Sequence, residues 1–152
     1  MEYYVYLTND CNLMCKYCSV LMDCKTFDIP LGITYNIEDL ISFIGRTQKD
    51  RGDSQVDVYF FGGEPTLEFP SMQKNITELK NNLDNYNINI ILHTNGLLLD
   101  SKLPQAILRQ LDLITLSINY HEIPHFNLGK GYFKKIINNA LEIKKMLILL
   151  QG

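Results

Sequence analysis

The chain has no tryptophan, no apolar run of the roughly 20 residues that a membrane span needs, and no excess of positive charge. The missing tryptophan excludes nothing by itself. The missing apolar run argues against an integral membrane protein. Its 14 Lys and Arg against 17 Asp and Glu give a net charge of −3, so no overall basic field points to nucleic acid.

The sequence also has no secretory leader pattern, because Met1 is followed by an acidic residue and then by a strand-like stretch. The four cysteines cluster near the start instead of spreading as a disulfide framework would. We therefore expect a reducing, cytoplasmic setting. With 152 residues, 46% hydrophobic and 20% charged, the chain has the size and composition of one soluble globular domain.

Strand-like and helix-like stretches alternate along the chain. Runs rich in β-branched, aromatic and apolar residues predict four strands, at Glu2–Thr8, Gln55–Phe61, Ile88–Thr94 and Leu113–Ile118. Apolar residues at helical spacing predict helices at Ile37–Arg51 with Asn36 as N-cap, Phe69–Tyr86 with Ser71 as a cap, Leu103–Leu111, and Gly131–Lys145. This order predicts right-handed βαβ units and a parallel sheet covered by helices.

Four segments with binding chemistry each follow a predicted strand. They are Asn9–Asp23, Gly62–Leu67, Thr94–Gly96 and Asn119–Phe126. Because the carboxyl ends of parallel strands meet at one edge of a sheet, we expect all four segments to form a single site.

Three cysteines in the first of these segments, Cys11, Cys15 and Cys18, are the strongest chemical signal. Three thiolates within eight residues are typical of a metal or cluster site, and an odd trio cannot pair off as disulfides. Iron–sulfur clusters usually take four cysteines, so three would leave one iron open to another ligand. The alternative is a zinc site closed by Cys24 or His93.

The spacing Cys11-x3-Cys15-x2-Cys18, with the aromatic Tyr17 before the last cysteine, resembles the cluster motif of the radical S-adenosylmethionine (SAM) superfamily. Gly62-Gly63-Glu64-Pro65, after the second predicted strand, resembles the GGEP motif of the same family. The resemblance covers nearly the whole chain. It implies a partial (β/α) TIM-like barrel, here of about four to five parallel strands with outer helices.

By this resemblance, the three cysteines hold a 4Fe-4S cluster whose open iron binds SAM. One electron from the cluster cleaves SAM reductively, and the 5′-deoxyadenosyl radical abstracts hydrogen from an unidentified substrate. The resemblance also implies a one-electron reductant of the flavodoxin or ferredoxin type. The turn Gly129-Lys130-Gly131 resembles one common in the branches that modify peptides or proteins.

The resemblance also assigns residues to SAM. Glu64 would accept the SAM ammonium, Gly62 and Gly63 would let the backbone approach the ligand closely, and Tyr17 would lie against the adenine. Alternation places Ser117 and Asn119 on one face of their strand. The expected SAM contacts are Tyr17, Gly62, Gly63, Glu64, Pro65, Asn95, Ser117 and Asn119.

The end of the chain leaves alternatives open. The apolar run Met146–Leu150 predicts either the start of a fifth strand or a continuation of the last helix. We expect residues 1–152 to form one radical SAM core domain that is incomplete at its C-terminal end. A non-catalytic module that binds a cluster and SAM is therefore the alternative to an enzyme.

An open sheet edge would also favour pairing with another copy or a partner protein. No role is assigned to Cys24, His121 or His125, which are more simply loop residues.

Overall fold

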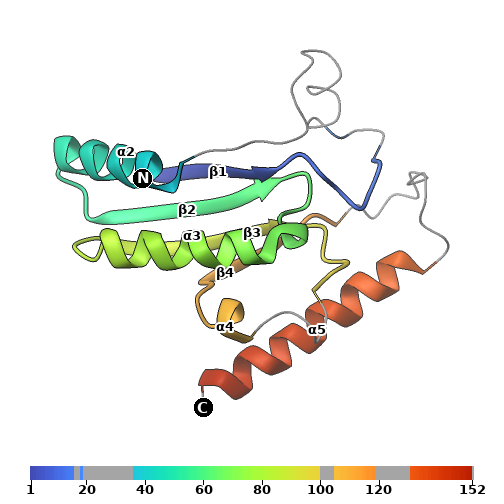
Figure 1. Ribbon diagram of the computed structural model, residues 1–152. Coiled ribbons are helices and arrows are strands. Elements are labelled where there is room, and N and C mark those ends of the chain that lie inside the picture. The colour runs from blue at the N-terminus through green and yellow to red at the C-terminus, as the bar shows by residue number, and fades with distance from the viewer. Residues whose placement is uncertain (16–17, 19–35, 100–104, 119–130, 152) are drawn as a thin grey trace.

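The computed structural model describes residues 1–15, 18, 36–99, 105–118 and 131–151 (Figure 1). Strands and helices alternate as the sequence predicts. In chain order the elements are β1 (Glu2–Thr8), α2 (Ile37–Arg51), β2 (Gln55–Gly62), the 3-10 helix η1 (Pro65–Glu68), α3 (Phe69–Asn82), β3 (Asn87–Thr94), α4 (Gln105–Leu108), β4 (Leu113–Leu116) and α5 (Tyr132–Gln151).

The four strands form one sheet in the order β1-β2-β3-β4, and every neighbouring pair is parallel. The register places Tyr3 beside Val58, Val58 beside Ile90, and Leu92 beside Ile114. Parallel neighbours require helical crossovers, and the intervening helices supply them. The predicted α/β sheet of parallel strands with outer helices is confirmed.

The hydrophobic core lies between one face of this sheet and the helices, with α2 and α3 side by side (Figure 1). Alternate residues of the strands point into it, in keeping with the two-residue period of a strand. Phe60, Ile44 and Ile76 are all fully buried there, from β2, α2 and α3. The core therefore fixes the strands against helices on one side only.

The opposite face of the sheet carries a row of aromatic rings. Tyr4 stacks on Tyr59 with ring centroids 4.7 Å apart, and Phe61 meets both Tyr4 and Tyr6 edge-on. His93 lies edge-on against Tyr59 at 5.4 Å. This face is less covered, since Tyr4 is 57% exposed.

The ends of α2 follow the local signals in the sequence. Asn36 is the predicted N-cap, and its side chain accepts a hydrogen bond from the Glu38 N–H at 2.9 Å. Gly52 ends the helix with a φ of 67°, a left-handed conformation that glycine adopts without strain.

Helix α3 starts at the predicted Phe69, but its cap and its end differ from the prediction. Glu68, not Ser71, precedes the helix, because Pro70 is tolerated in its first turn. The helix ends at Asn82 instead of Tyr86, since Asp84 and the residue after it form a turn. Helix α4 (Gln105–Leu108) ends before the predicted Leu111, and the predicted start at Leu103 lies outside the described residues.

The last helix and the last strand also differ from expectation. Helix α5 continues to Gln151, so Met146–Leu150 does not open a fifth strand. Leucine and methionine favour helix nearly as strongly as alanine, and extending an existing helix needs no new nucleus. Strand β4 ends at Leu116, two residues before the predicted Ile118. Within the described ranges, no helix combines the length and apolar character that crossing a bilayer requires.

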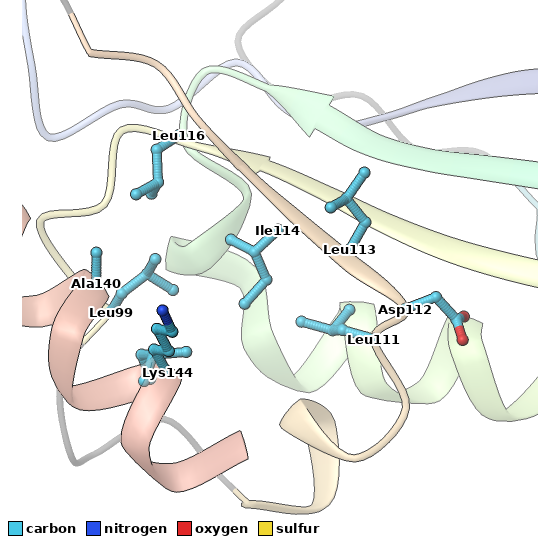
Figure 2. A pocket seen from close by; sticks show the side chains of 9 residues that line it. Leu99, Leu111, Asp112, Leu113, Ile114, Leu116, Ala140 and Lys144 are labelled. Atoms are coloured by element: carbon cyan, nitrogen blue, oxygen red, sulfur yellow. The ribbon is translucent and has the colours of Figure 1, made fainter. Parts of the chain in front are cut away.

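Strand β4 lies at an edge of the sheet and pairs only with β3 among the described residues. A cavity of about 290 Å³ lies between β4 and α5 (Figure 2). Its lining is mostly aliphatic, with Ile114 and Leu116 on the strand side and Ala140 and Ile143 on the helix side. The pairing of this edge with another copy or a partner stays a prediction.

Replacing Leu113 tests that prediction, because this edge residue is 56% exposed. If two copies pair at β4, the wild-type chain should scatter in solution with the mass of a dimer. A Leu113→Lys variant should then shift toward the monomer, since a charged side chain opposes edge pairing. Leu141→Lys, on α5 and 51% exposed, is the matched control and should stay dimeric. A monodisperse wild-type monomer would contradict self-pairing.

Candidate functional site

The segments that follow β1, β2 and β3 meet at one edge of the sheet. Where β1 and β2 end, the Gly63 N–H donates to the carbonyl of Thr8, the last residue of β1, and the Glu64 N–H donates to the Asp10 carbonyl, both at 2.7 Å. Beyond β3 and β4, the Ser117 N–H donates to the Thr94 carbonyl at 2.9 Å. The predicted convergence is confirmed for these segments, whereas Asn119–Phe126 lies outside the described residues.

The two glycines after β2 are needed because the chain's own backbone lies against them. A Cβ on Gly62 would collide with the Thr8 carbonyl oxygen. A Cβ on Gly63 would collide with the Asp10 carbonyl and lie 2.6 Å from the Asn9 carbonyl oxygen. Gly62 also has a φ of 141°, which other residues rarely adopt. The nearest neighbour of this turn is thus the backbone that leads into the cysteines.

Glu64 is 1% exposed and its carboxylate accepts four hydrogen bonds from the chain. Oε1 accepts from the N–H and the hydroxyl of Thr66 and, at 2.6 Å, from the hydroxyl of Thr94. Oε2 accepts from the Asn95 N–H at 2.8 Å. In the described part of the chain no cation pairs with this carboxylate, so hydrogen bonds alone replace its hydration. The expected bond from Glu64 to the SAM ammonium stays a prediction.

The turn after β3 connects this carboxylate to the cysteines. The Asn95 amide nitrogen donates to the Asn12 side-chain oxygen at 2.7 Å and lies 4.0 Å from the Cys11 sulfur. The Asn95 side-chain oxygen accepts from the Leu97 N–H at 3.0 Å, and Gly96 takes a φ of 78°. Asn95 was predicted to contact SAM, and the structure places it beside the first cysteine.

Asn139 is a residue of this site that the sequence did not reveal. Its amide nitrogen, on α5, donates to the carbonyls of Gly96 at 2.9 Å and Leu97 at 3.1 Å. The only signal in the sequence is an amide between apolar residues of a helix, which does not say what it contacts.

Cys11 and Cys15 lie at the rim of a small apolar cluster, and the described cysteines form no disulfide with one another. Leu13, Leu97 and Ile136 are buried, and Cys11 and Cys15 pack against them. The Leu13 N–H lies 3.4 Å from the Cys11 sulfur, and the Cys18 N–H donates to the Cys15 carbonyl at 3.1 Å.

Burial raises the pKa of the Cys11 thiol above its usual value. The Leu13 N–H opposes this shift, while the neighbouring charges of Glu64, Cys15 and Cys18 add to it. A metal must displace this thiol proton, so loading of the site should become easier as the pH rises.

The donor set fits an iron–sulfur cluster in its chemistry. Three soft thiols come from one short segment, and soft thiolates are the ligands that iron–sulfur clusters take. In the described part of the chain, however, no three His, Cys, Asp or Glu side chains converge closely enough to hold a metal ion. The cluster ligands therefore stay a prediction. His93, which was one possible ligand of the alternative zinc site, packs edge-on against Tyr59.

The remaining predicted residues are only partly placed. Pro65 opens η1, with Glu64 as its N-cap. Ser117 is exposed just beyond β4 and bonded through its N–H to Thr94. Tyr17, Cys24, Asn119, His121 and His125 lie outside the described residues.

Comparison with known proteins identifies a family and several similar chains. A profile of the radical SAM superfamily matches residues 5–148. An uncharacterised protein of Methanocaldococcus jannaschii is 31% identical over 124 residues, which make up 77% of this chain and 38% of that protein.

Two solved structures of native anSMEcpe, one with AdoMet and one with AdoMet and a peptide, superpose with a TM-score of 0.65 and 25% identity. Each superposition covers 95% of this chain and 40% of the solved chain. The sheet and helices described above thus share the TIM-like fold of these enzymes. The chain spans about two fifths of the length of the relatives it matches.

Substituting Gly63 tests the close packing at the site. We expect Gly63→Ala to lower the free energy of unfolding by about 3 kcal/mol, because the new Cβ would overlap backbone that cannot move aside easily. In the control Gly45→Ala, the Cβ would lie 3.8 Å from a Leu83 methyl and should add up to about 1 kcal/mol by helix propensity. Urea unfolding measures both. Equal free energies of unfolding for the two variants would contradict this prediction, because they would show that the backbone around Gly63 can move to accept a Cβ.

Proposed function

Because the chain belongs to the radical SAM superfamily, we propose that Cys11, Cys15 and Cys18 hold a 4Fe-4S cluster beside which SAM binds. The observation that carries this proposal is the placement of the cysteine segment. Hydrogen bonds join it both to the Gly62–Pro65 turn and to Asn95, so the two motifs of the family form one site.

The chemistry that a bound cluster supplies in this superfamily is one-electron reduction of SAM, which yields methionine and a 5′-deoxyadenosyl radical that abstracts hydrogen from a substrate. The protein's part is ligation, orientation and exclusion of water. Leu13, Leu97 and Ile136 shield Cys11 and Cys15 on one side. The Leu13 N–H is placed to donate to the Cys11 thiolate, and such bonds tune a cluster's potential.

We propose that SAM lies against the carboxyl ends of β2, β3 and β4. The turn at Gly62–Pro65, Asn95 and Ser117 border this region, and Tyr17 and Asn119 are proposed to complete it. The aromatic side of the sheet, with Tyr59 and Phe61, adjoins the same strands on the face away from the core helices. That face offers stacking and apolar contact to a substrate.

The proposed substrate class is a peptide or protein. It is supported by the peptide bound to a structural relative and by the turn at Gly129-Lys130-Gly131. The electron is proposed to come from a flavodoxin or ferredoxin. A non-catalytic module that binds the cluster and SAM is the second candidate, because this chain spans only two fifths of its relatives.

Anaerobic reconstitution with iron and sulfide tests the proposal. The wild-type chain should bind about four irons and release 5′-deoxyadenosine when dithionite and SAM are added. Cys15→Ala should lose the cluster spectrum and the product, because it removes a ligand. Cys24→Ala is the matched control and should retain both.

The results of this experiment distinguish the proposed enzyme from a non-catalytic module and from a zinc site. A cluster without 5′-deoxyadenosine would favour the non-catalytic module. Zinc without visible absorbance would overturn the proposal, as would an unchanged iron content in Cys15→Ala.

A further inference from the structure

We propose that Glu64 is a positioning residue that fixes the Thr94–Gly96 turn against the cysteine segment and acts on Cys11 through Asn95. The inference deepens the proposed function and rests on it for the cluster. It assigns the Glu64 side chain a role toward the protein's own backbone and hydroxyls, whether or not the ammonium group of SAM also reaches its second oxygen.

The first step is the set of donors around the carboxylate. Glu64 accepts four hydrogen bonds, three at Oε1 from Thr66 and Thr94 and one at Oε2 from Asn95. All these donors come from the protein, and Thr66 and Thr94 are buried, at 3% and 2% exposure. A ligand at Oε1 would have to displace a buried donor and leave it unsatisfied, whereas one lone-pair position remains at Oε2.

The second step is that the carboxylate bridges two strands. Thr66 belongs to the segment after β2, whereas Thr94 and Asn95 end β3, about 30 residues further along the chain. The Thr94 hydroxyl in turn accepts from the Gly96 N–H at 3.1 Å. One carboxylate thus orders the backbone of the whole Thr94–Gly96 turn.

The third step leads from this turn to the cysteines. Asn95 donates to Asn12 at 2.7 Å and lies beside the Cys11 sulfur. On the other side of the turn, Asn139 holds the carbonyls of Gly96 and Leu97. Because the turn is held from both sides, loss of the Glu64 anchor should loosen it chiefly where it meets Asn12 and Cys11.

The experiment measures the alkylation rate of each cysteine separately, by mass spectrometry, in the metal-free chain with iodoacetamide. Glu64→Gln keeps the shape of the side chain but turns one acceptor into a donor that faces other donors. We expect Cys11 to react about fivefold faster, the factor by which losing a buried hydrogen bond typically changes an opening equilibrium. Because the Glu64 charge also raises the pKa of Cys11, the same rise is required in Thr94→Val, which keeps that charge. Cys18, outside this network, should react at the wild-type rate.

Two further variants and a control sharpen the result. Thr94→Val removes the hydroxyl that donates to Glu64 and accepts from the Gly96 N–H, and it leaves the Glu64 charge in place, so it should reproduce the effect. The Glu64→Gln, Thr94→Val double variant should add little to either, since both act through one contact. Glu142→Gln, in an exposed pair with Lys145 on α5, should leave every rate unchanged.

A second measurement uses the reconstituted protein without SAM. Glu64→Gln and Asn95→Ala should each shift the electron paramagnetic resonance signal and the potential of the reduced cluster, because both disturb the surroundings of Cys11. Asn95→Ala leaves the buried carboxylate and its backbone bond intact, so it covers the case in which Glu64→Gln fails to fold.

Unchanged Cys11 reactivity in Glu64→Gln, or an equal rise at all three cysteines, would overturn the inference. So would a cluster signal that is normal without SAM while SAM affinity falls, because that pattern marks a direct ligand. Failure of the proposed function is separate, since it would show as missing iron in the wild-type chain.

Discussion

Two backbone hydrogen bonds, from Gly63 to Thr8 and from Glu64 to Asp10, continue the pairing of β1 and β2 beyond the end of β2. They place the start of the cysteine segment directly against the double-glycine turn. Any side chain at Gly62 or Gly63 would occupy the space of that backbone. The first two glycines of the motif therefore serve the protein's own packing, and the position of Cys11 follows from it.

This contact exists because the sheet is parallel and held from one side. Helices cover the face that buries Phe60, and aromatic rings occupy the other face. The carboxyl ends of successive strands then meet at one edge, where their loops bond to one another. A site built from three loops needs no long-range movement of the chain to assemble. It does need the polar groups of each loop to be satisfied, which Glu64 does from the neighbouring loop and Asn139 does from α5.

Much of the fold follows from local signals in the sequence. The remaining features depend on contacts between residues that are far apart in the chain. The limits of β1 and α2 match the prediction because the Tyr- and Val-rich run, the Asn36 cap and Gly52 act within a few residues. The run at Met146–Leu150 was ambiguous, since apolar residues suit strand and helix alike. In the site, the alternation of strands and helices predicted which loops meet. It did not predict that Thr94 and Asn139 bond within them, because periodicity carries no information on contacts between distant segments.

The buried carboxylate of Glu64 links the Gly62–Pro65 turn to the turn beside Cys11. A buried carboxylate without a cation must be surrounded by donors, or its burial would oppose folding. Here the donors include the Asn95 N–H and the Thr94 hydroxyl, which belong to the turn beside Cys11. The requirement to satisfy one charge therefore fixes the geometry of two loops. A protein that binds a cluster and a nucleoside between those loops needs that geometry before either ligand arrives, because preorganised donors and thiols bind with less ordering of the chain.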